Sequence, residues 1–376
     1  MNNQVHPNSV PVGLQSELTC LRQLSARVGS DPLLVQASNG NTSIKLEGVL
    51  WIKGSGKWLA QANQEEMFIP VDLAEAKGAV ERGGEIPQLR ISRNPMRPSI
   101  ETAMHAVLPH RVVIHVHSIN TIAWAIRLDA LDELAARLRG LHWEWIPYAE
   151  SGIPLAREIE MAVARARDTN VFILANHGLV VCGRDCSATE QLLCEVERRL
   201  VIPPRPFPEP DTTLLENISR SSGLQNPDFD SLHALGTDNT SLKILKGGML
   251  YPCQAIFLSE VLILPPTIVA SRLKSHLTAG ERPPSVVVVE RCGVMLHENI
   301  TNAERANLIG LIEVIRRTKE SAHLRYLSRE EVEKLLNAGG RGYKDEAEMD
   351  AKANSATSAT FSEEREPEYN RNTCLS

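Results

Sequence analysis

The chain has 376 residues, of which 43% are hydrophobic and 23% are charged. This apolar content is sufficient for one large domain or two medium ones, and it excludes a chain that is disordered throughout. The 46 acidic residues outnumber the 40 basic residues and give a net charge of −6, whereas proteins that bind nucleic acids normally carry a basic excess. We therefore expect no nucleic-acid partner.

The sequence contains no run of roughly 20 apolar residues, the length that a membrane-spanning helix needs. Residues 1–10 are polar and lack the apolar segment of a secretory signal. The seven cysteines are scattered, without a C-x-x-C pair, and therefore indicate neither a disulfide framework nor a thiolate zinc site. We expect a cytoplasmic protein with no membrane partner.

The first part of the chain alternates between predicted strands and helices. Apolar residues at helical spacing over 14–28, followed by Gly29, predict an opening helix. Two β-rich segments, at 112–117 and 171–175, predict buried strands. Shorter strands are expected at 33–36, 49–53 and 67–71, and helices at 118–128, 130–138 and 155–167. This order predicts an α/β fold.

A proline-rich segment at 203–211 divides the chain. Proline fixes the backbone and removes an amide donor, so we expect a linker there rather than a helix or a central strand. Near the C-terminus large apolar side chains are scarce, which predicts disorder. The expected organisation is an N-terminal arm (1–13), an α/β domain (14–202), the linker (203–211), a smaller α/β region of unknown role (212–338) and a disordered tail (339–376).

The second region contains a weak echo of the first. Its predicted elements are strands at 255–264 and 286–290 and a helix at 302–317 with Thr301 as N-cap. Residues 172–200 run strand, Asn-His-Gly, strand, turn, helix, and residues 287–315 follow the same order with Arg-Cys-Gly, so that Cys292 stands where the first copy has His177. The pattern favours a common supersecondary unit that is used twice.

Histidines occur at two predicted strand ends. His115 and His117 are two residues apart on one strand, so their side chains point to the same face. His177 stands where the second buried strand meets a glycine, and it is the best candidate for a third ligand. Neutral imidazole is a favoured zinc ligand. The alternative is a set of hydrogen-bonded histidines without a metal.

Glu101 lies one helical turn before His105, after Pro98. A carboxylate that is partly desolvated beside a divalent cation can act as a general base on a carbon acid. The alternative is an ordinary first-turn glutamate stabilised by the helix dipole. Two polar, glycine-containing loops at 38–43 and 53–57 could present amides and hydroxyls to an anion, or they could be plain hairpin turns.

In combination, these segments resemble the class II aldolase/adducin family over roughly residues 14–200. A further match, Leu108-Pro109-His110-Arg111, resembles the family's long members, which are related to the aldolase part of bifunctional rhamnulose-phosphate aldolase/dehydrogenase proteins. The motifs are Gly40-Asn41-Thr42-Ser43, Trp51-Ile52-Lys53-Gly54-Ser55-Gly56, Pro98-Ser99-Ile100-Glu101-Thr102, His115-Val116-His117 and Asn176-His177-Gly178.

The resemblance implies a three-layer α/β/α domain with a central, mainly antiparallel sheet, assembled as a homo-oligomer and usually as a tetramer. It also implies Zn2+ or another divalent transition metal as cofactor. By motif position the metal ligands would be His115, His117 and His177, the catalytic residues Glu101 and, by a looser match, Tyr148, and the substrate-binding residues Asn41, Ser55, Gly56 and Ser99. A half-buried tyrosine after a proline is the other interpretation of Tyr148.

The expected activity is that of a metal-dependent lyase of the aldolase type, which cleaves a small ketose, ketose phosphate or sugar acid through a metal-stabilised enediolate. An epimerase or a decarboxylase would use the same chemistry, and a non-catalytic adducin-like interaction protein would retain only the fold. Ile100 follows Ser99 where small fuculose-phosphate aldolases have paired serines, so one hydroxyl of a phosphate site is missing. No fused dehydrogenase is expected, because residues 201–376 lack a dinucleotide-binding glycine motif.

Overall fold

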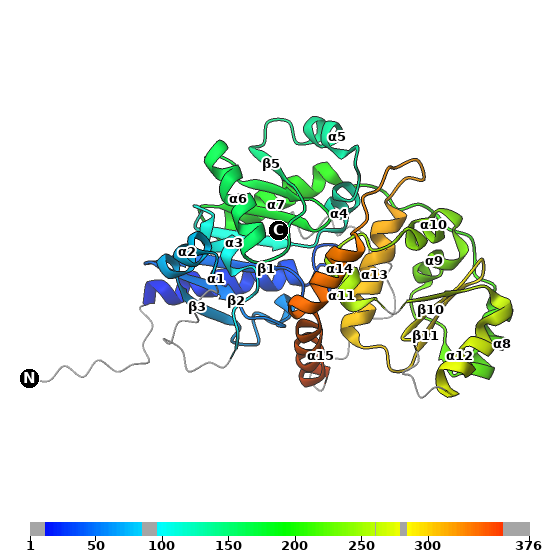
Figure 1. Ribbon diagram of the computed structural model, residues 1–376. Coiled ribbons are helices and arrows are strands. Elements are labelled where there is room, and N and C mark those ends of the chain that lie inside the picture. Colours follow the sequence, from blue (N-terminus) through cyan, green and yellow to red (C-terminus); the bar gives the residue numbers. More distant parts are fainter. Residues whose placement is uncertain (1–11, 85–95, 260, 279–283, 356–376) are drawn as a thin grey trace, which may run out of the picture.

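The computed structural model describes residues 12–84, 96–259, 261–278 and 284–355. Its N-terminal half is built on a seven-stranded sheet with the order β3-β2-β1-β4-β7-β6-β5 (Figure 1). Only the β5–β6 pairing is parallel. The strands are β1 (Asn41–Leu46), β2 (Val49–Lys53), β3 (Phe68–Asp72), β4 (Val112–Val116), β5 (Trp143–Ile146), β6 (Val171–Leu174) and β7 (Gly178–Gly183).

Helices cover both faces of this sheet. Alternate side chains of β4 enter different cores, with Ile114 packed in the cluster of α1, α4, α5 and α7 and Val113 in the cluster of α3 and α6. The expected three-layer α/β/α domain with a mainly antiparallel sheet is therefore confirmed. The helices are α1 (Val12–Gly29), α2 (Leu73–Arg82), α3 (Thr102–Val107), α4 (Ile119–Ala125), α5 (Ala130–Arg137), α6 (Ile153–Arg165) and α7 (Cys186–Leu200).

The C-terminal half contains a four-stranded sheet with the order β8-β11-β10-β9. Helices pack on both of its faces as well. The strands are β8 (Leu224–Gln225), β9 (Leu262–Leu264), β10 (Val286–Val289) and β11 (Gly293–His297). The helices are α8 (Thr212–Ser222), α9 (Ala234–Thr237), α10 (Asn239–Gly247), α11 (Pro252–Phe257), α12 (Val269–Thr278), α13 (Asn302–Arg316), α14 (Arg329–Leu335) and α15 (Arg341–Ser355).

The two sheets share a topology that extends further than the sequence echo. In the first sheet β5 and β6 are parallel, β6 and β7 antiparallel, and β7 and β4 antiparallel. The pairings of β9 with β10, β10 with β11, and β11 with β8 repeat this order. The turns correspond too, because Asn176 and Arg291 both have positive φ, at 53° and 63°. The C-terminal half is thus a second copy of this four-stranded unit.

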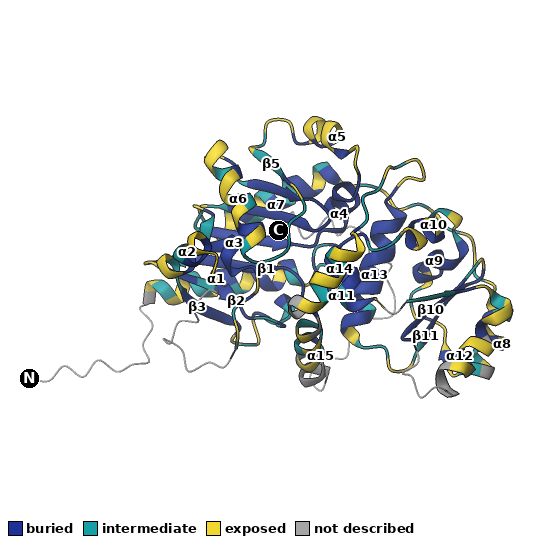
Figure 2. Cartoon of the chain, in the orientation of Figure 1, coloured by how far each residue is buried: buried dark blue, intermediate teal, exposed yellow. Residues whose placement is uncertain are grey.

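One hydrophobic cluster joins the two halves. It contains Ile119 and Ile122 of α4 together with Leu308 and Ile312 of α13, all at most 1% exposed. Figure 2 shows both helices mostly in the colour of buried residues. The proline-rich segment is also attached, because the amide of Arg205 donates to the carbonyl of Arg316 at 2.8 Å. The segment has no helix or strand, as expected, but it does not separate two independent cores.

Three predicted segments differ from the structure. Residues 33–36 form turns before β1, and residues 252–257 form α11, so that only 262–264 of the strand expected at 255–264 is extended. Part of the expected disordered tail is helical, because α15 gains its burial from distant parts of the chain, including Trp58 and Phe257. Residues 356–376 and most of the expected N-terminal arm lie outside the described ranges.

The predicted helix after Thr301 is confirmed as α13. The Thr301 hydroxyl accepts from the amide of Glu304, and the Glu304 carboxylate accepts from the amide of Thr301, which is a capping box. None of the helices within the described residues has the length and apolar character that a bilayer crossing requires.

Candidate metal centre

Three buried histidines meet beside the end of β4. The ring centroids of His115, His117 and His177 lie 5.0 Å apart in each pairing. One nitrogen of each ring can serve as a ligand atom, and these atoms all lie within 4.8 Å of one another. The structure therefore brings together the three side chains that the sequence suggested as metal ligands.

The sheet explains this convergence. His115 and His117 share a face because alternate side chains of a strand do, and His177 reaches them from the turn between β6 and β7. Gly178 must remain a glycine for this approach, since a Cβ there would lie 2.5 Å from the carbonyl oxygen of Val116. Asn176 holds the turn with positive φ, a conformation that asparagine tolerates better than most residues.

Hydrogen bonds orient two of the rings. His115 Nδ1 donates to the carbonyl of Leu179 at 3.0 Å, and His117 Nδ1 lies 3.3 Å from Cys253 Sγ on α11. In both rings Nε2 faces the centre of the cluster, where the two Nε2 atoms lie 3.2 Å apart. Burial and the neighbouring imidazoles lower the pKa of His117 well below its ordinary value, so the ring is neutral. Three converging imidazoles are a donor set that fits zinc.

Glu101 touches two of these histidines from the start of α3. Its carboxylate oxygens lie 3.2 Å from His115 Nε2 and 3.2 Å from His177 Nε2, and the residue is 5% exposed. Burial raises the pKa of Glu101, but the charges and hydrogen bonds of His115 and His177 outweigh it and lower the pKa well below its usual value. Glu101 is thus an ionised carboxylate in contact with the histidine cluster.

Asn41 connects Glu101 to the neighbouring polar groups. Its Nδ2 donates to Glu101 at 2.7 Å and to the hydroxyl of Ser99 at 3.0 Å. Its Oδ1 accepts from His105 Nε2 at 2.5 Å, while His105 Nδ1 accepts from the Ser43 hydroxyl at 2.7 Å. Asn41 and the other four side chains of this network are buried. Two of the predicted substrate-binding residues, Asn41 and Ser99, therefore lie beside the carboxylate.

Ser55 and Gly56 lie on the loop after β2, next to the segment that carries Ser99. The amide of Ser99 donates to the carbonyl of Lys53 at 3.1 Å, and the amide of Ser55 donates to the carbonyl of Arg97 at 2.8 Å. The two segments thus run side by side. The Ser55 hydroxyl is already engaged, because it donates to Glu346 of α15 at 2.7 Å.

Within the described residues, no hydrogen bond or ring contact joins Tyr148 to the histidine cluster. The guanidinium of Arg325 lies 4.7 Å above its ring, and burial raises the pKa of its hydroxyl. That hydroxyl is buried without a hydrogen-bond partner. Ser151 on the same loop does contact the site, because its hydroxyl donates to Glu101 at 3.2 Å.

Sequence reasoning missed several residues around the centre. Ser151 and Cys253 carry no motif signal, and Asn176 was noted only as part of a motif. Its side-chain amide donates at 2.8 Å to the carbonyls of both Leu250 and Arg325, which attaches the turn of His177 to the C-terminal half. Only the unusual pairing of Asn with a following His and Gly could have indicated this turn.

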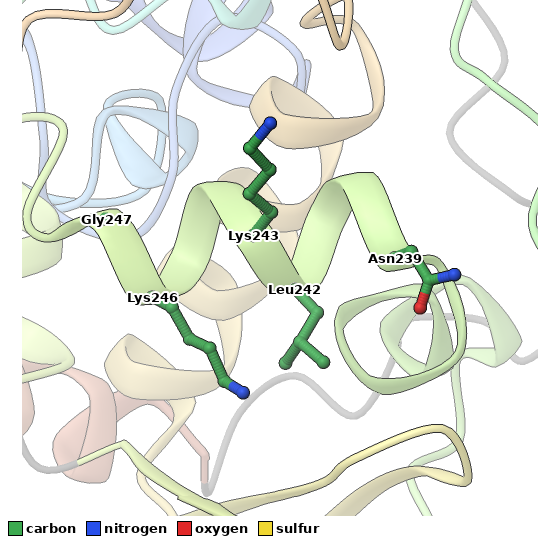
Figure 3. Close-up of a pocket in the computed structure, with 5 residues that line it drawn as sticks. All are labelled: Asn239, Leu242, Lys243, Lys246 and Gly247. Atoms are coloured by element: carbon green, nitrogen blue, oxygen red, sulfur yellow. The ribbon is translucent and has the colours of Figure 1, made fainter.

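A separate surface pocket lies on α10 and has no part in the histidine cluster. Figure 3 shows Lys243 and Lys246 pointing away from the helix in different directions. Lys246 is paired with Glu290 at 2.7 Å. The two ammonium groups do not converge on a common ligand position. The pocket is lined by Asn239, Leu242, Lys243, Lys246 and Gly247.

The chain has relatives among proteins of known sequence and structure. It is 30% identical over 175 residues to the "Uncharacterized oxidoreductase YuxG" of Bacillus subtilis (strain 168); the match covers 42% of this chain and 25% of the relative. The chain thus spans a quarter of that relative's length.

Solved structures give matches over about half of the chain. The N-terminal class II aldolase domain of a conserved protein from Thermoplasma acidophilum is 23% identical, with 53% of this chain and 97% of that chain covered and a TM-score of 0.44. The l-fuculose-1-phosphate aldolase from Thermus thermophilus is 17% identical, with 54% of this chain and 96% of that chain covered and a TM-score of 0.37.

The sequence pattern of the "Class II Aldolase and Adducin N-terminal domain" family matches residues 23–202. This range contains Glu101, its Asn41 partner and all three clustered histidines. The narrower resemblance to the rhamnulose-phosphate subgroup stays a prediction. Residues 23–202 of this chain thus form a domain that matches the class II aldolase and adducin family.

Proposed function

We propose that the chain is a zinc-dependent lyase of the class II aldolase type, which cleaves a carbon–carbon bond in a small ketose, ketose phosphate or sugar acid. The observation that carries the proposal is the contact of one buried, ionised carboxylate with two of three converging histidines. Burying a carboxylate among imidazoles has a high desolvation cost, so this arrangement is seldom found unless it serves binding or catalysis.

The chemistry divides between the metal and the protein. A divalent ion held by His115, His117 and His177 supplies positive charge that stabilises negative charge developing on a substrate oxygen. Glu101 accepts or returns the proton at the reacting hydroxyl or carbon, and Asn41 and Ser151 hold its two oxygens in place. The buried surroundings exclude water and strengthen these interactions.

Two further points are part of the proposal. The substrate's polar end would lie toward Ser99 and Ser55, on the side of Glu101 where Asn41 connects the groups. Tyr148 would donate a proton to the leaving fragment, a role that its unpartnered buried hydroxyl supports. An epimerase or a decarboxylase would use the same residues, so the products of a substrate screen decide among the three reactions.

The metal content of the purified full-length protein tests the proposal. We expect about one zinc per chain in the wild type and a loss of most of it in His115→Ala and His177→Ala, because two imidazoles form a much weaker site. His110→Ala is the matched control, since it removes an imidazole outside the cluster. Equal metal content in all four proteins would refute the assignment. Ketoses, ketose phosphates and sugar acids are then screened for cleavage.

A further inference from the structure

The C-terminal helix α15 lies against the loop that we expect to hold the substrate's polar end. It lies between the two halves of the molecule (Figure 1). Glu346 on this helix accepts from the Ser55 hydroxyl at 2.7 Å and forms an ion pair with Arg97. A hydroxyl and a guanidinium are groups that bind phosphate oxygens. An internal carboxylate thus holds both groups that could receive an anion at this loop.

Gly56 lets the helix come this close. A Cβ at Gly56 would lie 2.9 Å from the Cβ of Glu346 and 3.1 Å from its backbone carbon, and the residue has a φ of +74°. A side chain at this position would displace α15 as well as strain the loop. The glycine that the sequence assigns to substrate binding therefore serves, in this structure, the contact with Glu346.

Further contacts fix α15 in this position. The Tyr343 hydroxyl donates to the carbonyl of Ser38 at 2.9 Å, and its ring packs edge-on against Phe257 with centroids 5.9 Å apart. Lys344 is paired with Glu304 at 2.7 Å, and Ala347 is completely buried. These anchors come from both halves of the chain. Glu346 is therefore held at the loop by a docked element rather than by one flexible side chain.

We propose that Glu346 is a specificity-determining residue, which occupies the position of a substrate anion and makes the site select a substrate with an uncharged, hydroxyl-bearing end over a phosphorylated one. This inference rests on the proposed function. A phosphate at Ser55 would have to displace the carboxylate and then lie beside its negative charge. Of the substrate classes above, the structure favours the unphosphorylated ketose, in line with Ile100 beside Ser99.

Binding of inorganic phosphate to the full-length protein, measured by titration calorimetry, tests this role. Glu346→Ala removes the carboxylate and opens the space, and Glu346→Gln removes only the charge. We expect both variants to bind phosphate at least tenfold more tightly than the wild type. Asp345→Asn is the matched control, because it removes one negative charge from an exposed neighbouring position on the same helix and should bind as the wild type does.

A second substitution locates the binding. Adding Ser55→Ala to Glu346→Ala should abolish most of the gain, and a gain that persists would place the anion elsewhere and overturn the inference. Wild-type protein that binds phosphate as tightly as the Glu346 variants would overturn it as well, since the anion would then displace α15 freely. The titration measures binding without turnover, so a failure of the lyase proposal leaves these outcomes interpretable.

Discussion

The Glu101 carboxylate has an environment in which its charge and its position are both fixed. Two imidazoles lower its pKa, and Asn41 and Ser151 each donate a hydrogen bond to one of its oxygens. We expect Glu101→Gln to retain zinc and to lower turnover by about 10²- to 10⁴-fold, the usual contribution of a general base. Steady-state kinetics with the cleaved substrate and elemental analysis of the metal give the two readouts.

The exposed residue Glu160 on α6 provides the comparison for this variant. Glu160→Gln makes the same chemical change outside the histidine cluster, and it should have wild-type turnover. A Glu101→Gln protein that is as active as Glu160→Gln would remove Glu101 from the mechanism.

Cys253 supports a proposed metal ligand from outside the family domain. Burial raises the pKa of its thiol, which therefore stays neutral and can accept from His117 Nδ1. Loss of such a partner typically weakens metal binding about 10- to 100-fold. We expect Cys253→Ala to bind zinc at least tenfold more weakly in competition with a chelator. Cys292→Ala, at the corresponding turn of the second copy, should be unchanged, and equal weakening in both would argue against a specific role.

The composition of the C-terminal segment does not reveal that it forms the docked helix α15. Its own sequence is polar, so the tail was expected to be disordered, yet Tyr343 and Ala347 are anchored by parts of the chain that are about 300 residues distant. Local pattern predicts a helix only when its apolar face is evident. A helix that docks through a tyrosine, an alanine and ion pairs has little such pattern.

Removal of α15 is therefore expected to destabilise the protein. A chain that ends at Gly340 loses the burial of Ala347, the Tyr343 contacts and the Glu346 pair, which we expect to cost about 2 kcal/mol or more and to lower the melting temperature by about 2–3 °C or more. Calorimetry measures the shift. A chain that ends at Ser355 keeps every described contact of α15 and serves as the reference; identical melting of the two chains would mean that the helix contributes nothing.

Much of the first domain could be predicted from the sequence, but few of the contacts around the histidine cluster could. β2 was expected with its observed ends, and the His115–His117 spacing predicted a shared face, since both depend on local period alone. The contacts of Cys253, Glu346 and Asn176 depend on how the two halves pack. Residues 33–36 and 255–257 were expected as strands but are not, because short apolar runs fit a turn, a helix or a strand equally well.

The repeated four-stranded unit is the main feature at the scale of the whole molecule. The pairing of β8 with β11 puts Gln225 at the position of Ile114, so Asn226 and Asp228 follow where the first copy has His115 and His117. Cys292 stands in the place of His177. Among the described residues, only the first copy assembles three potential metal ligands of this kind. The second copy lacks this ligand set and contributes packing surface.

This packing surface predicts that the two halves unfold together. Since α4 and α13 share one buried cluster, neither sheet can lose its helices without exposing the other. We expect a single calorimetric transition for the full chain. Ile122→Ala in α4 and Ile312→Ala in α13 should both lower that one melting temperature, and two separate transitions would show that the halves are independent. The expected homo-oligomer, a tetramer by family resemblance, is measured in the same samples by sedimentation.

The His177 turn is attached to the C-terminal half within one chain, and this attachment bears on how the protein behaves on dilution. Cys253 contacts His117, and the carbonyls of Leu250 and Arg325 hold Asn176 beside His177; all of them belong to the same polypeptide that carries the histidines. The covalent chain fixes the local concentration of these groups, so they cannot dissociate from the cluster in the way that a neighbouring subunit can. Even where the subunits of an oligomer separate, each chain keeps these contacts around its histidine cluster.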